Sequence, residues 1–289
     1  MMLATVQDKH VPKTIWSSLS QPGGSKPNED RFLAATNRFA VLDGATNVSH
    51  AKPLIMGMEP AEYAAHHFQQ GLMDTNMCLD NLLLKLNHSL DKVIKQYIPN
   101  PAVIERFSTA AAVIDINEGF LEYRTIADCY FVLIMKDGNI QTPYPFQSIN
   151  QDRENLLKLK SIRASFKGLD KDFDPFSELH QDLKVLRGMV NRTYGAFNGM
   201  PQAMSFVKRG KLPIDNVKSI LLFTDGMLLP QEDPAAEPDF EKIAWMYKHG
   251  GLGFWYGKVR SEEGSDPYFL KYPAVKRHDD ATALAIDFF

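Results

Sequence analysis

The sequence predicts an α+β fold in which helices are layered on antiparallel β-sheets. Apolar strand-like runs are followed by a pair of helical segments, then by more strands, more helices and a last strand. A parallel sheet would instead alternate strands with helices throughout. With 289 residues, 44% of them hydrophobic, the chain can bury a large core. We expect a single domain over 1–289 with its core at about 14–288, because no sharp linker interrupts the pattern.

The N-terminal half is predicted to contain strands, a helix pair and further strands. Period-2 and β-branched runs indicate strands at 14–20, 31–36, 39–42, 108–116, 120–127 and 130–135. Apolar residues at helical spacing indicate helices at 59–70 and 75–97. Asn37 and Asn117-Glu118-Gly119 are turn residues between strands, and Asp137-Gly138 turns the chain into a further strand. The runs from 108 onward therefore predict an antiparallel meander.

The C-terminal half begins with charged, helix-compatible sequence from 150 to about 191. Short strands are predicted at 194–197 and 203–207, and the most apolar strand of the chain at 217–224. Two helices, at 240–249 and 252–263, precede a final strand at 281–288.

Composition argues against several classes of protein. The net charge of -3 and a pI near 6.2, without a Lys/Arg-rich run, leave no basic surface for nucleic acid. Only Cys78 and Cys129 are present, too few for a disulfide framework, which favours a reducing compartment. No stretch reaches the roughly 18 apolar residues that span a bilayer, so we expect no membrane partner and a cytoplasmic protein. The oligomeric state is left open.

Five aspartates stand at the ends of predicted strands across nearly the whole chain. They are Asp30, Asp43, Asp128, Asp225 and Asp279. If folding brings them together, their charges repel one another in a poorly solvated site, and cations must join them. Hard divalent cations prefer such oxygen ligands. Gly44 and Gly226 directly follow two of the aspartates, and glycine allows a backbone carbonyl to approach an ion closely.

Six sequence blocks around these aspartates stand in a recognisable order. They are Asn28-Glu29-Asp30, Ala40-Val41-Leu42-Asp43-Gly44, Ser108-Thr109-Ala110, Ile126-Ala127-Asp128-Cys129, Leu222-Phe223-Thr224-Asp225-Gly226 and Asp279-Asp280-Ala281-Thr282. With these blocks, the chain from about 16 to 287 resembles the type 2C protein phosphatases, the metal-dependent PPM family of Ser/Thr phosphatases, especially bacterial members. The resemblance implies a four-layer α-β-β-α sandwich of two antiparallel sheets flanked by helices.

The resemblance also implies a centre of two Mg²⁺ or Mn²⁺ ions. Asp43 would bridge them, the carbonyl of Gly44 would bind one, and Asp225 and Asp279 would complete the other. A ligand set of oxygens alone suits these hard ions and disfavours zinc. Asp43 and Asp225 would be catalytic by holding ions that activate a water for attack on phosphorus, without a side-chain nucleophile.

Three more acidic residues are assigned supporting roles by the resemblance. Glu29 and Asp30 would act near the ions, Glu29 through a metal-bound water. Asp128 would support a third, weaker ion together with Asp225.

The phosphate-binding side departs from the family pattern. Most members carry an arginine where this chain has Ser25, and the neighbouring Lys26 is one replacement, as a point charge without the bidentate fork of arginine. Arg187 and Arg192 are two more, because the segment 187–201 lies where family members place a flap beside the active site. We expect a helical and flap insertion at about 150–210.

The predicted function is hydrolysis of phosphoserine and phosphothreonine in proteins by a metal-dependent phosphomonoesterase. One alternative is a phosphatase-like regulator that binds a phosphoprotein without turnover, and another is a phosphatase of a small phosphorylated metabolite or nucleotide. A haloacid-dehalogenase-like phosphatase is excluded, because its nucleophilic aspartate would stand at the position of Val41.

Overall fold

The structure, a computed structural model, describes residues 14–24, 27–46, 48, 53–74, 76–143 and 153–289. Its strands are β1 Thr14–Gln21, β2 Arg31–Ala34, β3 Arg38–Gly44, β4 Thr109–Asn117, β5 Phe120–Ile126, β6 Tyr130–Met135, β7 Ile140–Gln141, β8 Lys208–Pro213, β9 Val217–Phe223 and β10 Ala281–Phe288. Its α-helices are α1 Pro60–Gly71, α2 Leu79–Tyr97, α3 Arg153–Ser165, α4 Pro175–Gly188, α5 Ala203–Phe206 and α6 Phe240–Ser265. Short 3₁₀ turns lie at Val103–Glu105, Asp170–Asp172 and Asp225–Met227.

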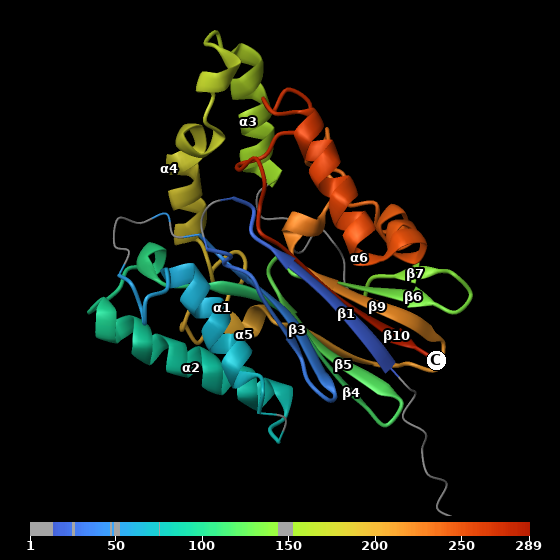
Figure 1. Ribbon diagram of the computed structural model, residues 1–289. Coiled ribbons are helices and arrows are strands. Elements are labelled where there is room, and N and C mark those ends of the chain that lie inside the picture. The colour runs from blue at the N-terminus through green and yellow to red at the C-terminus, as the bar shows by residue number, and fades with distance from the viewer. Residues whose placement is uncertain (1–13, 25–26, 47, 49–52, 75, 144–152) are drawn as a thin grey trace, which may run out of the picture.

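The described strands form two five-stranded antiparallel sheets (Figure 1). The first sheet has the order β1-β10-β9-β6-β7, and the second has the order β2-β3-β4-β5-β8. The main core contains side chains of both sheets, among them Val41, Ala112 and Leu284, all buried. The two sheets therefore face each other as a sandwich.

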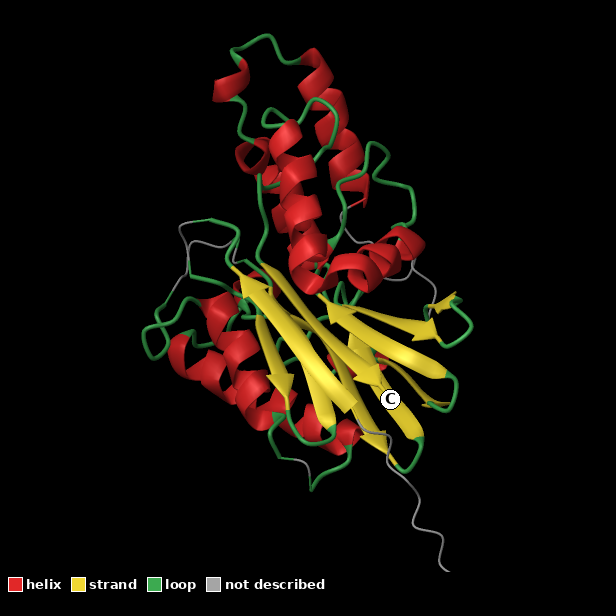
Figure 2. Cartoon of the chain, turned by 45° about the vertical axis from the view of Figure 1, so that its right-hand side comes forward, coloured by secondary structure: helices red, strands yellow, loops and turns green. Residues whose placement is uncertain are grey.

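Helices cover the outer faces of the sandwich (Figure 2). Helices α1 and α2 pack on the second sheet, and Phe68 and Leu82 share a buried cluster with Leu42 of β3. Helix α6 covers the first sheet, with Trp255 in the main core. The predicted four-layer α-β-β-α arrangement is thereby confirmed, and it follows from the apolar stripe of each helix, which must be buried against a sheet.

Helices α3 and α4 rise from one end of the sandwich (Figure 1). They have a small core of their own around Leu159, Phe173 and Leu179, against which Phe269 and Val275 pack. Phe269 and Val275 belong to the segment between α6 and β10, so this segment links the helical extension to the sheets.

The predicted meander is wrong at one step. β4 and β5 pair as a hairpin and β6 pairs with β7, but β6 lies in the other sheet, beside β9. The chain changes sheets at Ala127, whose φ of 59° is left-handed. Such a residue turns the strand direction sharply, so β6 leaves the plane of β5 instead of returning along it.

Two further expectations about local structure are corrected. Where a strand was expected at 203–207, Ala203–Phe206 form the short helix α5, and Tyr194 and Phe197 make only isolated bridges. The edge strand β8 was not predicted, because the sequence of Lys208–Pro213 is polar and contains glycine and proline. No helix in the described ranges is long and apolar enough to cross a membrane.

Candidate functional site

Antiparallel pairing brings the predicted aspartates to one end of the sandwich. In the second sheet, Arg31 of β2 is paired with Leu42 of β3, so Asp30 and Asp43 stand opposite each other. In the first sheet, β9 ends next to the beginnings of β6 and β10. Asp225, Asp128 and Asp279 therefore gather at that same end, each just outside its strand.

Burial and mutual repulsion act on the carboxylates. Burial raises the pKa of Asp30 well above its usual value, and Asp279 and Asp225 raise it further, although a hydrogen bond from Thr224 opposes them. The pKa values of Asp43 and Asp225 are also well above the usual range, first because both are buried and then because neighbouring carboxylates, Asp128 and Asp279 among them, raise both values. Without a cation, the end of the sandwich therefore disfavours ionisation of these three groups.

Glu29 lies beside the cluster and is held by two neighbours. Its backbone N donates to Oδ2 of Asp280 at 2.6 Å, and its Oε2 accepts from the hydroxyl of Thr46 at 2.5 Å. Burial raises the pKa of Glu29, while Thr46 and Lys276 lower it. Asp280 also accepts from the backbone N of Gly23 at 2.7 Å, so it ties two loops to the start of β10.

The glycines after Asp43 and Asp225 are required by close backbone contacts. A Cβ at Gly44 would lie 2.5 Å from the carbonyl oxygen of Ala61, and one at Gly226 would lie 1.9 Å from that of Asp280. Any larger residue would push apart the segments that carry the aspartates. These two Asp-Gly pairs therefore fix the site and are not hairpin turns.

Sequence reasoning missed Lys276, which lies inside the carboxylate cluster. Its Nζ donates to Oδ1 of Asp279 at 2.9 Å and to the hydroxyl of Thr46 at 3.1 Å. Burial alone would lower the pKa of Lys276, but the carboxylates of Asp279, Glu29 and Asp43 raise it well above its usual value. The sequence feature that could have indicated Lys276 is its position three residues before Asp279, because a lysine at that spacing can reach the carboxylate.

Two cavities flank the carboxylates. The larger, of about 250 Å³, is bordered mainly by apolar residues such as Leu229, Phe269 and Tyr272. The smaller, of about 150 Å³, contains Asp43 and reaches helix α4. Both cavities are lined by Asp128, Asp225, Val275, Lys276 and Asp279. The cluster therefore lies where the two cavities meet, and it is open to a ligand.

The structure separates the three phosphate-binding candidates. Arg187 lines the smaller cavity, where its guanidinium donates to the hydroxyl of Ser108 at 3.2 Å and to the carbonyl of Thr46 at 3.3 Å. Arg192 is exposed and is not among the residues that line these two cavities. Lys26 lies outside the described residues. Arg187 is thus the one of the three that the structure places with the carboxylates.

The donor set fits hard divalent ions in its chemistry. The predicted ligands offer only oxygens, since they are the carboxylates of aspartates and a glutamate and the backbone carbonyl of Gly44. Among the described residues, however, no three His, Cys, Asp or Glu side chains converge closely enough to form a ready-made metal site. The two observations are compatible. Without an ion, the carboxylates repel one another and stay apart, whereas ligands of one ion must each lie about 2.0–2.6 Å from it. Binding would draw the carboxylates together.

Comparison with solved structures identifies proteins of the same fold. The catalytic domain of the serine/threonine protein phosphatase PstP, in complex with two manganese ions, matches with a TM-score of 0.55 and 15% identity, over 95% of this chain and 97% of that one. PppA, a key regulatory component of T6SS in Pseudomonas aeruginosa, matches with a TM-score of 0.56 and 15% identity, over 96% and 98%. RsbX in complex with magnesium matches with a TM-score of 0.51 and 12% identity, over 96% of each chain.

Sequence comparison adds no relative, since neither a family model nor a curated protein matches this chain. The expected resemblance to type 2C phosphatases is thus confirmed for the fold.

Proposed function

We propose that this protein is a Mg²⁺- or Mn²⁺-dependent phosphomonoesterase that acts on phosphoserine and phosphothreonine in proteins. The observation that carries the proposal is the gathering of Asp30, Asp43, Asp128, Asp225 and Asp279 at one open end of the sandwich. Solved structures of the same fold include a serine/threonine protein phosphatase with two manganese ions and a protein with magnesium. We further propose that 14–288 form one catalytic domain, with 150–210 as an insertion.

In this proposal, each acidic residue has a role at a centre of two ions, with a third held more weakly. Asp43 would be a ligand shared by two ions, and the carbonyl of Gly44 would hold one of them. Asp225 and Asp279 would hold the other, and Asp128 would support the third. Glu29 would act through water, and Asp30, which accepts a hydrogen bond from Thr224, would be an outer ligand. When bound, the ions would supply positive charge for the phosphoryl group and activate a water.

The residues of the chain itself would position the substrate. Arg187 lines the smaller cavity beside Asp43 and is oriented by Ser108 and Thr46, so it can contact a phosphoryl oxygen. The larger, mainly apolar cavity continues from the same carboxylates. An apolar cavity beside the carboxylates can bury apolar side chains that flank a phosphorylated residue in a polypeptide.

The test is an assay of the purified protein on p-nitrophenyl phosphate and on a phosphothreonine peptide, with Mn²⁺ and with EDTA. We expect turnover of both only with Mn²⁺, and loss of about 100-fold or more in Asp43→Asn and Asp225→Asn, the scale seen when transition-state charge stabilisation is removed. Turnover in EDTA, or variants as active as the parent, would overturn the mechanism.

Two alternatives have their own outcomes in this assay. A protein that binds the phosphopeptide but turns over neither substrate is a regulator. A protein that hydrolyses nucleotides and not peptides is a small-molecule phosphatase.

A further inference from the structure

Lys276 connects the carboxylates to the loop that follows β3. Its Nζ contacts Asp279 at 2.9 Å and the Thr46 hydroxyl at 3.1 Å, and that hydroxyl donates to Glu29 at 2.5 Å. The side chains of Lys276 and Asp279 are 37% and 38% exposed. More than a third of the Lys276 side chain is therefore exposed, while its ammonium contacts Asp279 and the hydroxyl that is bonded to Glu29.

Lys276 and Arg187 converge on one residue. Lys276 contacts the side-chain hydroxyl of Thr46, and Arg187 contacts its carbonyl oxygen at 3.3 Å. The two cations come from segments far apart in the chain, helix α4 and the approach to β10, and both line the smaller cavity with Asp43. An anion that enters this cavity meets two positive side chains around Thr46.

We propose that Lys276 binds the phosphoryl group of the substrate, together with Arg187. The proposal rests on the proposed function, since it assigns a further residue of the same site. A phosphate monoester is an anion, and positive side chains beside the acidic cluster would attract it in addition to any bound ions. A lysine ammonium has three N–H donors, and the contacts with Asp279 and Thr46 use two of them. The third can donate to a phosphoryl oxygen.

The competing role for Lys276 is that of a counter-ion for Asp279 alone. The two roles predict opposite behaviour in the metal-loaded protein. A phosphate-binding lysine contributes to phosphate affinity when the ions are bound. A counter-ion competes with the ions for Asp279, so its removal strengthens metal binding and leaves phosphate affinity unchanged.

Calorimetry separates these roles without depending on turnover. Binding of inorganic phosphate to the Mn²⁺-loaded full chain, and binding of Mn²⁺ itself, are measured for the parent, Lys276→Met, Lys276→Gln and Lys276→Arg. We expect Lys276→Met and Lys276→Gln to weaken phosphate binding about tenfold and to raise KM for p-nitrophenyl phosphate similarly. Lys276→Arg should retain most of the affinity, because it keeps the charge. Two neutral variants are used so that the measurement can still be made if one of them does not fold.

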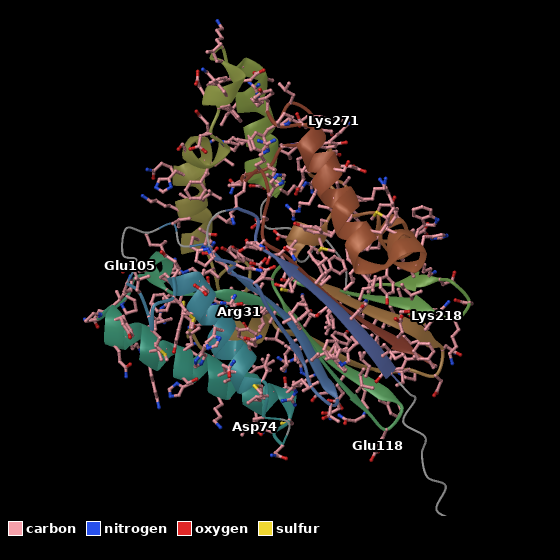
Figure 3. The ribbon with its side chains drawn as sticks, in the orientation of Figure 1. Arg31, Asp74, Glu105, Glu118, Lys218 and Lys271 are labelled. Carbon is pink, nitrogen blue, oxygen red and sulfur yellow. The ribbon has the colours of Figure 1, made fainter. Side chains whose placement is uncertain are left out.

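Lys271→Met is the matched control. Lys271 belongs to the same segment but is exposed, contacts Tyr272 and Glu232, and lies at the periphery beyond the end of α6 (Figure 3). This variant should bind phosphate as the parent does. Unchanged phosphate affinity in both neutral Lys276 variants, with tighter Mn²⁺ binding, would overturn the proposal.

The experiments also distinguish a failure of the phosphate-binding role of Lys276 from a failure of the proposed enzymatic activity. Lys276-dependent phosphate binding in a protein without turnover would support this inference and contradict the enzyme. Metal-dependent turnover with normal KM and normal phosphate affinity in Lys276→Gln would support the enzyme and contradict this inference.

Discussion

The hydroxyl of Thr224 donates a hydrogen bond to Oδ2 of Asp30 at 2.7 Å, across 194 positions of sequence. Thr224 follows β9 of the first sheet and Asp30 precedes β2 of the second, and both are buried, at 0% and 2% exposure. The same hydroxyl accepts from the backbone N of Thr282 at 3.0 Å. This contact joins the two sheets at the end where the aspartates gather.

Replacing Thr224 by valine should destabilise the protein. Valine keeps the shape of threonine but leaves Asp30 without its hydroxyl donor, and an unsatisfied buried polar group costs about 1–3 kcal/mol. We expect urea denaturation to show a fall of that size in the free energy of unfolding. Thr224→Ser keeps the hydroxyl and is the control. Equal losses in both variants would mean that packing of the methyl group, and not the hydrogen bond, is responsible.

Neutralising one aspartate should stabilise the metal-free protein while it removes metal binding. Asp225 is close enough to Asp43 and Asp279 for their charges to raise its pKa, so Asp225→Asn relieves repulsion. For a chain of this size, each kcal/mol of relief raises Tm by about 2–4 °C. In EDTA, the variant should melt above the parent, and Mn²⁺ should no longer raise its Tm.

Asp215→Asn provides the control for that experiment. Asp215 is exposed, in the short turn before β9, away from the cavities. Its neutral variant should melt as the parent does in EDTA and should keep the Mn²⁺-induced increase. A metal-free Asp225→Asn protein that melts below the parent would contradict the repulsion argument.

Stability of the metal-free protein should fall as pH rises from about 5 to 8. Because Asp30, Asp43 and Asp225 have pKa values raised by folding, the folded state binds more protons than the unfolded state above the ordinary carboxyl range of about 4. The free energy of unfolding then decreases with pH until these groups are ionised in the folded state. His67 acts in the opposite direction, because burial lowers its pKa below the usual value of about 6.5.

A comparison of variants isolates the contribution of the cluster. Chemical denaturation in EDTA across this pH range should give a smaller decrease for Asp225→Asn than for the parent, because His67 is common to both. Asp80 and Asp91, whose pKa values are lowered, affect stability only at more acid pH. Parallel pH curves for the two proteins would contradict the prediction.

A buried ion pair holds the second sheet to the α1–α2 connection. Arg38 is 1% exposed, and its Nε and Nη2 donate to the two carboxylate oxygens of Asp115, each at 2.7 Å. The guanidinium also donates to the carbonyl oxygens of Asp74 at 2.6 Å and Met77 at 3.1 Å. Arg38→Met should cost about 3–5 kcal/mol, because it leaves the Asp115 charge unpaired in a buried position.

Urea denaturation of single and double variants checks this prediction. Arg38→Met combined with Asp115→Leu should recover part of the loss, since no unpaired charge remains. Lys158→Met, which breaks the exposed pair with Asp182, should change the free energy of unfolding by under about 1 kcal/mol. An Arg38→Met protein as stable as Lys158→Met would show that the buried pair contributes little.

Local patterns were enough to predict most elements and the fold class. Val217–Phe223 ends in the apolar run Ile220-Leu221-Leu222-Phe223, and Leu79–Tyr97 carries leucines at helical spacing. Such signals depend only on neighbouring residues. Elements whose sequence lacks these signals were missed or mistaken, as with polar β8 and helix α5. The passage of the chain from one sheet to the other between β5 and β6 was not predicted either. It depends on the pairing of β6 with β9, which is distant in the sequence.

By itself, the sequence determined where the aspartates of the proposed site stand, since each of them lies where an apolar run begins or ends. Only the tertiary structure decided what surrounds them. Lys276 and Arg187 meet at Thr46 because β3, α4 and the approach to β10 end at the same place, although they are far apart in the chain. No local pattern encodes that proximity, because it arises from the packing of the two sheets and the helices above them.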